Sequence, residues 1–471
     1  MNTTISLNTH RNPFVKNVLT FFSNPLALAV GLVFASDSLL FGSWIAHIPH
    51  VKAKLGLSDA QLGLVLFAMP VGLLLMNPFT GRIIARLGEA RACLWSAVGL
   101  AAVVCIPINA PNAYVLSLGL FLMGLNASLI NVAMNTAATN LERQQNIVIM
   151  SACHGMWSLG GLLGSAVAGF VIAQHVSPSL HVFIMSILVL IITLVLQPRL
   201  AKIPSSSRTE TGEKAGSSFV KPTFDLWLMI LIGVAVSMGE GVALDWSAVY
   251  LRETLGASSQ VAALGFGCFS LTMTSLRFVG DAITPRIGAR RWLQIGGLVG
   301  AAGLALAIAL PYPPTALIGF ALLGVGCSLG APILYAAALR IPGIPPAAGL
   351  ATFASFSFIG FLAGPPLIGF IAEAAGLYYG LGFVGAVHQK GNLAGLVDER
   401  RRKGNAENLL LGQPYFLHAH LLIVQHRRVR KQRSRVGVVA QAQQHEVKFG
   451  FLFAKKLLDI HAVLRSRLGG L

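Results

Sequence analysis

The stretch GRIIARLGEAR (residues 81–91) returns 200 residues later as DAITPRIGARR (281–291), with two arginines and a glycine kept in place. The same offset links three other parts of the chain. The matched pairs are Gly56/Gly256, Arg86/Arg286, Gly88/Gly288, Arg91/Arg291, Gly119/Gly319, Gly124/Gly324, Ser128/Ser328, Gly160/Gly360, Gly164/Gly364 and Gly169/Gly369. One offset at four separate places indicates a duplication, and each copy consists of long apolar runs. The pattern is typical of two similar membrane-helix bundles that rock about a central site.

The composition excludes an ordinary soluble protein. Of the 471 residues, 55% are hydrophobic and 11% are charged, whereas average globular domains carry about 25% charged residues. A membrane-spanning helix needs roughly 20 mostly apolar residues. Such runs lie at 26–48, 60–84, 92–110, 113–138, 147–174, 179–198, 225–250, 259–283, 292–310, 314–339 and 347–375. A twelfth run begins at 377 but stops at His388.

These runs predict an all-α membrane protein with two pseudo-symmetric six-helix bundles. The bundles are expected at residues 26–198 and 225–387, with an incomplete twelfth helix in the second. Residues 199–224 are rich in Ser, Lys, Gly and Pro and are predicted to form a flexible linker. Residues 1–25 have no apolar run followed by a small-residue cleavage site, so we expect a retained N-terminal tail rather than a signal peptide.

The basic residues in the loops predict the orientation. With the N-terminus in the cytoplasm, fifteen lysines and arginines fall in cytoplasmic loops. Only Lys52, Lys54 and Arg252 then fall in outside loops. By the positive-inside rule, this asymmetry favours a multi-pass protein with a cytoplasmic N-terminus.

Three stretches are similar to a known transporter family. Residues 81–91 resemble the glycine-and-arginine signature of the major facilitator superfamily, with Ala85 where the family usually carries an acid. NVAMNTAATNLERQQNIVIMSACHGMWSLGGLLGSAVAG (131–169) and GEGVALDWSAVYLRETLGAS (239–258) resemble its MosC/YbjJ-like bacterial permeases, which are related to fucose permeases. The resemblance covers about residues 25–387. It implies a twelve-helix, two-bundle carrier of the bacterial inner membrane that works by alternating access.

Residues 388–471 depart from this family pattern. They hold 16 of the 35 lysines and arginines, with basic clusters at 401–403 (RRK) and 426–435 (HRRVRKQRSR). Two alternatives stay open: a shifted reading frame or misjoined segment, or a polybasic tail held at anionic lipid. No zinc-binding, helix-turn-helix or RNA-binding signature accompanies the charge, so we expect no nucleic-acid partner.

Acidic side chains inside the apolar runs are the first candidates for a functional site. A charge at the bilayer centre costs about 2.5–3.5 kcal/mol on insertion scales, so it needs a reason. Asp37 lies about eleven residues into the first run, roughly 17 Å deep, with Phe41 and Trp44 on the same helix face. We expect Asp37 to bind a proton or a substrate hydroxyl or amine. The alternative is a carboxyl group that hydrogen-bonds a neighbouring helix.

Glu240 is the corresponding candidate in the second copy and is expected to face the cavity between the bundles. Asp245 follows five residues later, which is about 140° of rotation on an α-helix, so the two acids should not share a face. Beside Trp246 and Tyr250, Asp245 is expected in the outer aromatic belt or at a gate.

Polar stripes on the fourth and fifth runs are candidates for substrate binding. The fourth run carries Ser128, Asn131 and Asn135, and the fifth carries His154, Trp157, Ser158 and Ser165. A short loop should bring Asn131 and His154 to a similar depth. An amide, an imidazole and an indole would suit a polyhydroxylated ligand, and the alternative for His154 is an interhelical hydrogen bond.

Glycines and loop charges are candidates for packing and gating. Gly160, Gly164, Gly360 and Gly364 are predicted to form flat faces for close helix contact, and Pro365 to add a kink. Arg277 and Asp281, at i and i+4, are predicted to pair and to latch the cytoplasmic gate. The repeated loop residues expected at this gate are Arg86, Gly88, Arg91, Arg286 and Gly288.

Together these features predict a secondary active transporter of a small polar solute, sugar-like or polyol-like, acting as a monomer in the lipid bilayer. Protons entering through Asp37 or Glu240 could drive it, because one charge moving through 100 mV yields about 2.3 kcal/mol, roughly a fifty-fold gradient. No GxxxxGK[ST] motif or metal-ligand spacing is present, so we expect no enzyme, cofactor or metal. A drug or metabolite exporter, a non-transporting membrane sensor and a non-functional product remain as alternatives.

Overall fold

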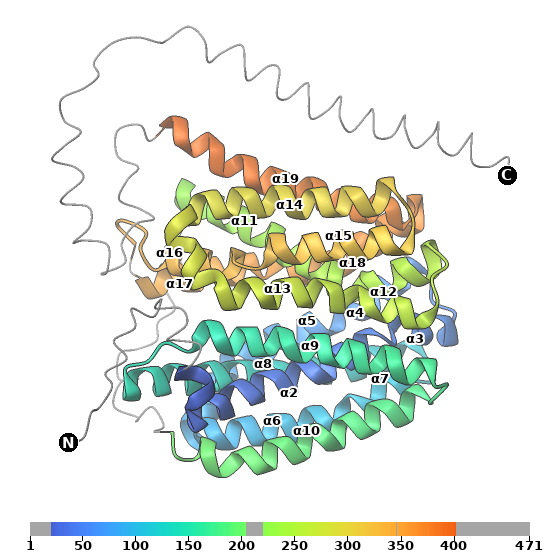
Figure 1. The fold of residues 1–471 in the computed structure, drawn as a ribbon, viewed down its shortest axis with the longest axis horizontal. Coiled ribbons are helices and arrows are strands. Elements are labelled where there is room, and N and C mark those ends of the chain that lie inside the picture. Colours follow the sequence, from blue (N-terminus) through green and yellow to red (C-terminus); the bar gives the residue numbers. More distant parts are fainter. Residues whose placement is uncertain (1–19, 204–219, 345, 402–471) are drawn as a thin grey trace, which may run out of the picture.

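The computed structural model describes residues 20–203, 220–344 and 346–401, which form helices joined by short turns (Figure 1). The first-half helices are α2 (Pro25–Ile45), α3 (Ile48–Leu55), α4 (Asp59–Leu66), α5 (Ala68–Leu87), α6 (Glu89–Val103), α7 (Cys105–Asn109), α8 (Ala113–Gln145), α9 (Met150–Ala173) and α10 (Pro178–Leu200). The predicted tail at 1–25, the linker at 199–224 and the basic tail lie largely outside the described residues.

The second half begins with a helix that changes type along its length. It consists of α11 (Phe224–Gly241), the π-helical turn η2 (Val242–Trp246), α12 (Ser247–Val249) and the π-helical turn η3 (Tyr250–Thr254). The remaining helices are α13 (Ser259–Ile287), α14 (Ala289–Ala309), α15 (Pro313–Cys327), α16 (Gly330–Ala338), α17 (Pro346–Ser357), α18 (Ile359–Ala375) and α19 (Leu377–Arg401).

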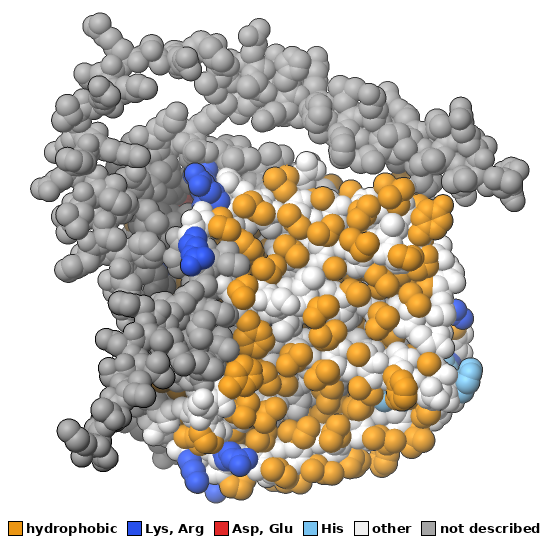
Figure 2. Space-filling view, viewed as in Figure 1, with side chains coloured by type: hydrophobic (Ala, Val, Ile, Leu, Met, Phe, Trp, Pro, Cys, Tyr) orange, Lys and Arg blue, Asp and Glu red, His pale blue; other side chains and the backbone are white. Residues whose placement is uncertain are grey.

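Eleven helical segments among the described residues are long and apolar enough to cross a membrane. Each coincides with one of the eleven predicted runs, so the predicted spans are confirmed. Large apolar side chains such as Phe183, Leu194 and Leu298 are exposed on the outside of these helices. Figure 2 shows the resulting band of hydrophobic side chains, with lysine and arginine at its ends. Such a surface suits contact with lipid rather than water.

The two halves lie side by side as helix bundles that repeat each other in detail (Figure 1). Gly124 packs so tightly that a Cβ there would collide with the carbonyl oxygen of Met69, and Gly324 meets Phe269 in the same way. Gly324 and Phe269 lie 200 residues after Gly124 and Met69, so the same contact is made at equivalent positions of the two halves. Gly56 and Gly256 also share a left-handed conformation, with φ of 62° and 65°. The duplication in the sequence is therefore a duplication of local structure.

The bundles meet along α9 and α13, and along α4 and α18. We call the side with the α3–α4 and η3–α13 turns the Lys52 end, and the side with the α5–α6 and α13–α14 turns the Arg86 end. Because α4 is the half of the second span nearest the Lys52 end, its packing on α18 closes that end. At this contact a Cβ on Gly63 would lie 2.5 Å from the carbonyl oxygen of Pro365.

The predicted glycine faces pack helices within each bundle, with one exception. A Cβ at Gly160 would collide with Ala35 O, and one at Gly164 with Leu39 O, so these glycines hold α9 against α2. Gly360 holds α18 against α11 through Val234 O. Gly364 differs, because a Cβ there would meet no atom within 4 Å. Close helix contact therefore explains Gly160, Gly164 and Gly360 but not Gly364.

Gly160→Ala is expected to lower stability by about 1–3 kcal/mol, because the new methyl group must push α9 away from α2. Gly364→Ala is the matched control, since it adds the same methyl group to open space on a helix. It should leave stability unchanged or raise it by up to about 1 kcal/mol. Thermal unfolding of the purified protein in detergent measures both, and equal effects of the two substitutions would contradict this packing.

The twelfth helix extends further than its apolar run. The apolar stretch ends at His388 as predicted, but α19 continues to Arg401, because no proline interrupts the helix there. The imidazole of His388 is 3% exposed, and its Nδ1 donates to Ala235 O at 3.1 Å. His388 therefore belongs to the packed bundle rather than to the tail in which the sequence analysis placed it.

Candidate functional site

Asp37 lies near the middle of α2 with its carboxyl group buried. Its side chain is 4% exposed. The indole Nε1 of Trp157, on α9, donates to Asp37 Oδ2 at 3.2 Å. Oδ1 is buried and has no hydrogen-bond partner among the described residues. One carboxyl oxygen is thus fixed by Trp157, and the other is available to bind a proton or a hydrogen-bond donor of a ligand.

His154 lies one helical turn before Trp157 on the same helix. Its ring meets the ring of Phe34 edge to face, with centroids 5.4 Å apart and planes at 72°. His154 and Trp157 are both half-buried. Trp44, which was expected beside Asp37, is 3% exposed and packs within the hydrophobic core. The structure thus joins Asp37 to Trp157, sets His154 one turn from Trp157 on the same helix, and places Trp44 in the core.

Arg277 joins the two bundles. Its Nη2 donates to Glu240 Oε1 at 3.3 Å, and its Nη1 donates to Ser158 Oγ, on α9 of the other bundle, at 3.1 Å. Its Nε donates to Ser328 O at 3.2 Å. The predicted partner was Asp281, whose side chain lies outside the described part of the chain. The pairing with Asp281 therefore stays a prediction, and the described structure shows the Arg277 guanidinium at the bundle contact, where Glu240 supplies an opposite charge.

Trp157 and Ser158 are neighbours on α9, so the two buried acids are linked through one helix. Asp37 contacts Trp157, and the next residue, Ser158, contacts the Arg277–Glu240 pair. Each bundle therefore contributes one carboxyl group to a continuous polar layer. Moving the bundles relative to each other must change the Arg277–Ser158 contact.

The asparagines of the fourth span take no part in this layer in the described structure. Asn131 is exposed, and Asn135 is half-buried. Asn135 Nδ2 donates to the backbone oxygen of Asn131 at 2.8 Å, one turn back on α8. No hydrogen bond joins either amide to His154 or Trp157 among the described residues. The predicted convergence of amide, imidazole and indole therefore stays a prediction.

The prediction of an outer aromatic belt around Asp245 is wrong. Trp246 and Tyr250 are both 0% exposed, and Tyr250 donates its hydroxyl to Ala307 O at 2.7 Å. Helices α13 and α14 cover this part of the chain, so both rings lie in the protein core. Asp245 is half-buried within the π-helical turn η2. The rotation that separated it from Glu240 assumed a regular α-helix and does not apply across this turn.

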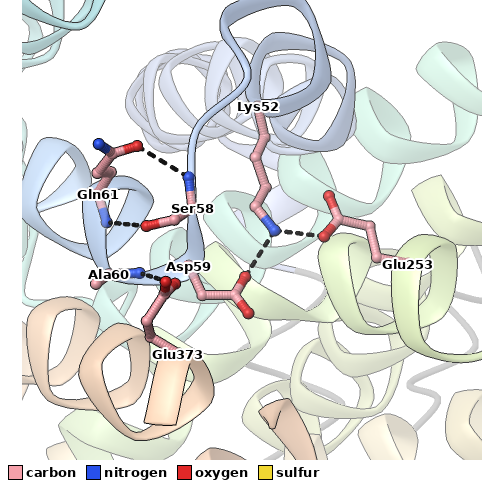
Figure 3. Close-up of polar contacts among 7 residues, drawn as sticks. All are labelled: Lys52, Ser58, Asp59, Ala60, Gln61, Glu253 and Glu373. Carbon is pink, nitrogen blue, oxygen red and sulfur yellow. Dashed lines mark hydrogen bonds and ion pairs between the residues drawn. The ribbon is translucent and has the colours of Figure 1, made fainter.

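A second polar cluster closes the Lys52 end. Lys52 donates to Asp59 Oδ1 at 2.6 Å in its own bundle and also pairs with Glu253 in the other bundle (Figure 3). Glu373, at the end of α18, accepts from the backbone N–H of Ala60 at 3.4 Å. Sequence reasoning counted Lys52 only as a loop charge. Lys52 lies on α3 and is only 7% exposed. The apolar residues around it in the eight-residue stretch IPHVKAKL (48–55) were the signal in the sequence that this segment forms a buried helix.

Lys52→Gln is expected to loosen this end, because it removes both ion pairs and leaves Glu253 without its cross-bundle partner. Amide hydrogen exchange in residues 48–59 and 250–258 should become about fivefold faster, which corresponds to roughly 1 kcal/mol for partly exposed pairs. Lys54→Gln is the control, since Lys54 is exposed and, among the described residues, its side chain donates to Ile108 O at 3.4 Å and to no acid. Equal exchange in the two variants would exclude a latch at Lys52.

The repeated loops at the Arg86 end share one backbone geometry. Gly88 and Gly288 separate successive spans with φ of 77° and 88°, which favours glycine. Arg86, Arg91 and Arg286 are exposed. Glu89 was not singled out from the sequence, yet it is 4% exposed and accepts from Asn140 Nδ2 at 3.0 Å. Within the described residues, no group of three or more His, Cys, Asp or Glu could hold a metal ion.

Comparison with known proteins identifies the family. The model of the Major Facilitator Superfamily matches residues 26–341. The chain belongs to this superfamily. Among curated relatives, an uncharacterized transporter (y4wD) of Sinorhizobium fredii is 32% identical over 344 residues, covering 73% of this chain and 90% of the relative. The membrane protein MosC of Rhizobium meliloti is 30% identical over 400 residues, covering 84% and 94%.

Other comparisons agree with this membership. An uncharacterized MFS-type transporter of Yersinia pestis is 33% identical over 361 residues, covering 75% of this chain and 90% of the relative. The crystal structure of a variant of the nucleoside transporter NupG has a TM-score of 0.64 at 12% identity, over 79% of this chain and 99% of that one. A bacterial homolog of the human lysosomal transporter Spinster, in an inward-facing and occupied conformation, has a TM-score of 0.60 at 14% identity, covering 81% and 97%.

The superfamily assignment confirms the resemblance predicted from the sequence and the two-bundle fold. It also makes the protein a membrane transporter of the MFS type, which carries a small-molecule solute. The buried polar layer of Asp37, Trp157, Ser158, Arg277 and Glu240 then lies where the two bundles of such a transporter meet.

Proposed function

We propose that this transporter moves a small polar solute, sugar-like or polyol-like, across the bacterial inner membrane by alternating access and uses protons to drive the movement. The observation that carries the proposal is the buried carboxyl group of Asp37, which has one oxygen held by Trp157 and the other without a partner. An uncompensated charge at that depth is costly. A role in binding and releasing a proton during transport explains why an acid is placed there.

The link between the bundles supports alternating access. The Arg277–Ser158 contact crosses between the bundles at the polar layer, and the Lys52–Glu253 pair crosses at the Lys52 end. If the Arg86 end faces the cytoplasm, as the loop charges predict, this arrangement is closed to the outside. Opening it requires that Lys52 release Glu253, and the same movement shifts Arg277 relative to Ser158.

The rings of α9 and the amides of α8 support a polyhydroxylated solute. Trp157 donates to the Asp37 carboxyl group, His154 lies one turn away on α9, and Asn131 is exposed on α8. Indole and imidazole rings can lie against the apolar face of a sugar, while carboxylate and amide oxygens accept from its hydroxyls. These groups carry no net positive charge, so they favour a neutral solute over an anionic one.

A solute panel in proteoliposomes tests the proposal. Pentoses, hexoses, polyols, organic acids and lipophilic cations are added singly, while a trapped dye reports the internal pH and radiolabel reports uptake. We expect at least one sugar or polyol to move with protons and to accumulate under an imposed pH gradient. Proton movement only with lipophilic cations would indicate an exporter instead, and uptake of a solute with no proton movement would exclude proton coupling.

A further inference from the structure

The Lys52 end holds a pocket of about 580 Å³ that the polar layer does not explain. It lies between the bundles. The α2–α3 turn, α3, the end of α9 and the α9–α10 turn line one side, and Arg252, Glu253 and the start of α13 line the other. Its volume falls in the range of small-molecule sites, about 300–1,000 Å³. The pocket is therefore large enough for a ligand and is built from both bundles.

The lining of this pocket is rich in groups that bind anions. His50 and His175 come from the first bundle and Arg252 comes from the second, while His47, which also lines the pocket, shares a hydrogen bond with His181 Nδ1 at 2.9 Å. The Arg252 guanidinium donates to Ala257 O at 2.8 Å and has no acidic partner among the described residues. Most of its donors thus stay available for a carboxylate or phosphate oxygen, which are the groups that arginine pairs with best.

The one acid that lines the pocket already has a cationic partner. Glu253 pairs with Lys52, which also pairs with Asp59 (Figure 3). In addition, two long helices begin at the pocket wall: α10, of 23 residues, at Pro178, and α13, of 29 residues, whose first residue is Ser259. The N-terminus of a helix carries partial positive charge and favours anions. Arg252 and the starts of these two helices are therefore the positive groups that face the pocket.

His175 has a backbone conformation that is unusual for its type. Its φ is 56°, in the left-handed region that non-glycine residues rarely adopt, and its side chain is exposed at the pocket. This conformation closes the end of α9, because the His175 N–H donates to Ile172 O and the Val176 N–H donates to Val171 O. Asparagine tolerates this conformation better than most residues, so His175→Asn removes the imidazole without adding strain.

The geometry points to a second binding site in this pocket, for a small anion with a carboxylate or phosphate group, separate from the polar layer of Asp37 and Arg277. Because both bundles line it, an anion bound there joins them across the Lys52 end. Binding then favours the state in which this end is closed, since a ligand stabilises the state that it binds. The bound anion would slow transport without being transported.

Equilibrium binding to the purified full chain tests this site, with labelled citrate and labelled inorganic phosphate as probes and labelled sorbitol as the uncharged reference. We expect citrate, phosphate or both to bind, and sorbitol not to compete. Arg252→Gln should weaken binding about tenfold or more, and His175→Asn should weaken it measurably. Lys54→Gln, which removes a positive charge from the same end outside the pocket, should bind like the unchanged protein.

The outcomes separate the sources of the anion and the two sites. Citrate binding alone identifies a carboxylate ligand, and phosphate binding alone a phosphate ligand. Asp37→Asn should bind the anion normally, because that residue is not part of the pocket. The inference is overturned if neither probe binds at millimolar concentration, or if Arg252→Gln and His175→Asn bind as tightly as Lys54→Gln. His175→Asn keeps the test decisive if Arg252→Gln does not fold.

Discussion

Asparagine in place of Asp37 is expected to abolish proton-coupled accumulation of the solute without unfolding the protein. Asparagine has nearly the same shape as aspartate, and its side-chain oxygen can still accept from Trp157 Nε1, which is 3.2 Å from Asp37 Oδ2. The asparagine side chain, however, cannot bind and release a proton as the carboxyl group can. An accumulation of roughly fifty-fold at 100 mV should therefore fall to none, while the solute still equilibrates across the membrane.

Two further variants show whether this loss comes from the proton or from the position of the carboxyl group. Trp157→Phe removes the indole donor and keeps the acid, so it should alter solute affinity and retain proton movement. Glu373→Gln removes an acid at the Lys52 end, and its amide oxygen can accept the same bond from Ala60 N, so it should transport normally. Wild-type coupled flux in Asp37→Asn would show that the role assigned to this acid is wrong.

Arg277→Gln is expected to cause the largest loss of stability of any single charge removal described here. It leaves Glu240 without its charged partner, at a position where the two side chains are only 10% and 17% exposed. It also removes the contact with Ser158 across the bundles. Breaking a buried pair from one side costs about 3–5 kcal/mol, because the remaining charge is uncompensated.

The double variant Arg277→Gln/Glu240→Gln separates charge balance from function. It removes both charges, so its free energy of unfolding should return to within about 1–2 kcal/mol of the unchanged protein, while transport stays lost. Arg286→Gln is the control on the same helix, and as an exposed change it should cost less than about 0.5 kcal/mol. Unfolding in detergent compares these two variants and Arg277→Gln with the unchanged protein. A double variant no more stable than Arg277→Gln would exclude the buried pair.

Much of the fold could be predicted because lipid imposes strict local requirements. A span must be long and apolar wherever the rest of the chain lies, so all eleven spans were found from composition alone. The repeat was equally visible. Gly56 and Gly256, or Gly88 and Gly288, adopt positive φ in both copies, a requirement that local sequence carries.

The partners of the charged residues could not be predicted in the same way. The i, i+4 spacing on one helix suggested Asp281 for Arg277, and it gave no sign that Glu240 on α11 and Ser158 on α9 of the other bundle also contact the guanidinium. Lys52 and Glu253 are 201 residues apart and meet only because the bundles close at that end. Spacing along a helix does not report which helix packs against it.

The amino-acid sequence by itself determined the membrane class, the duplication, the span positions and two of the buried acids, Asp37 and Glu240, because each follows from the local cost of placing a residue in lipid. Only the tertiary structure decided which side chains share a site. It joined Asp37 to Trp157, Arg277 to Glu240 and Lys52 to Glu253, and it placed Trp246 and Tyr250 in the core. The physical reason is that pairing depends on the packing of helices far apart in the chain, and this is set by contacts summed over both bundles.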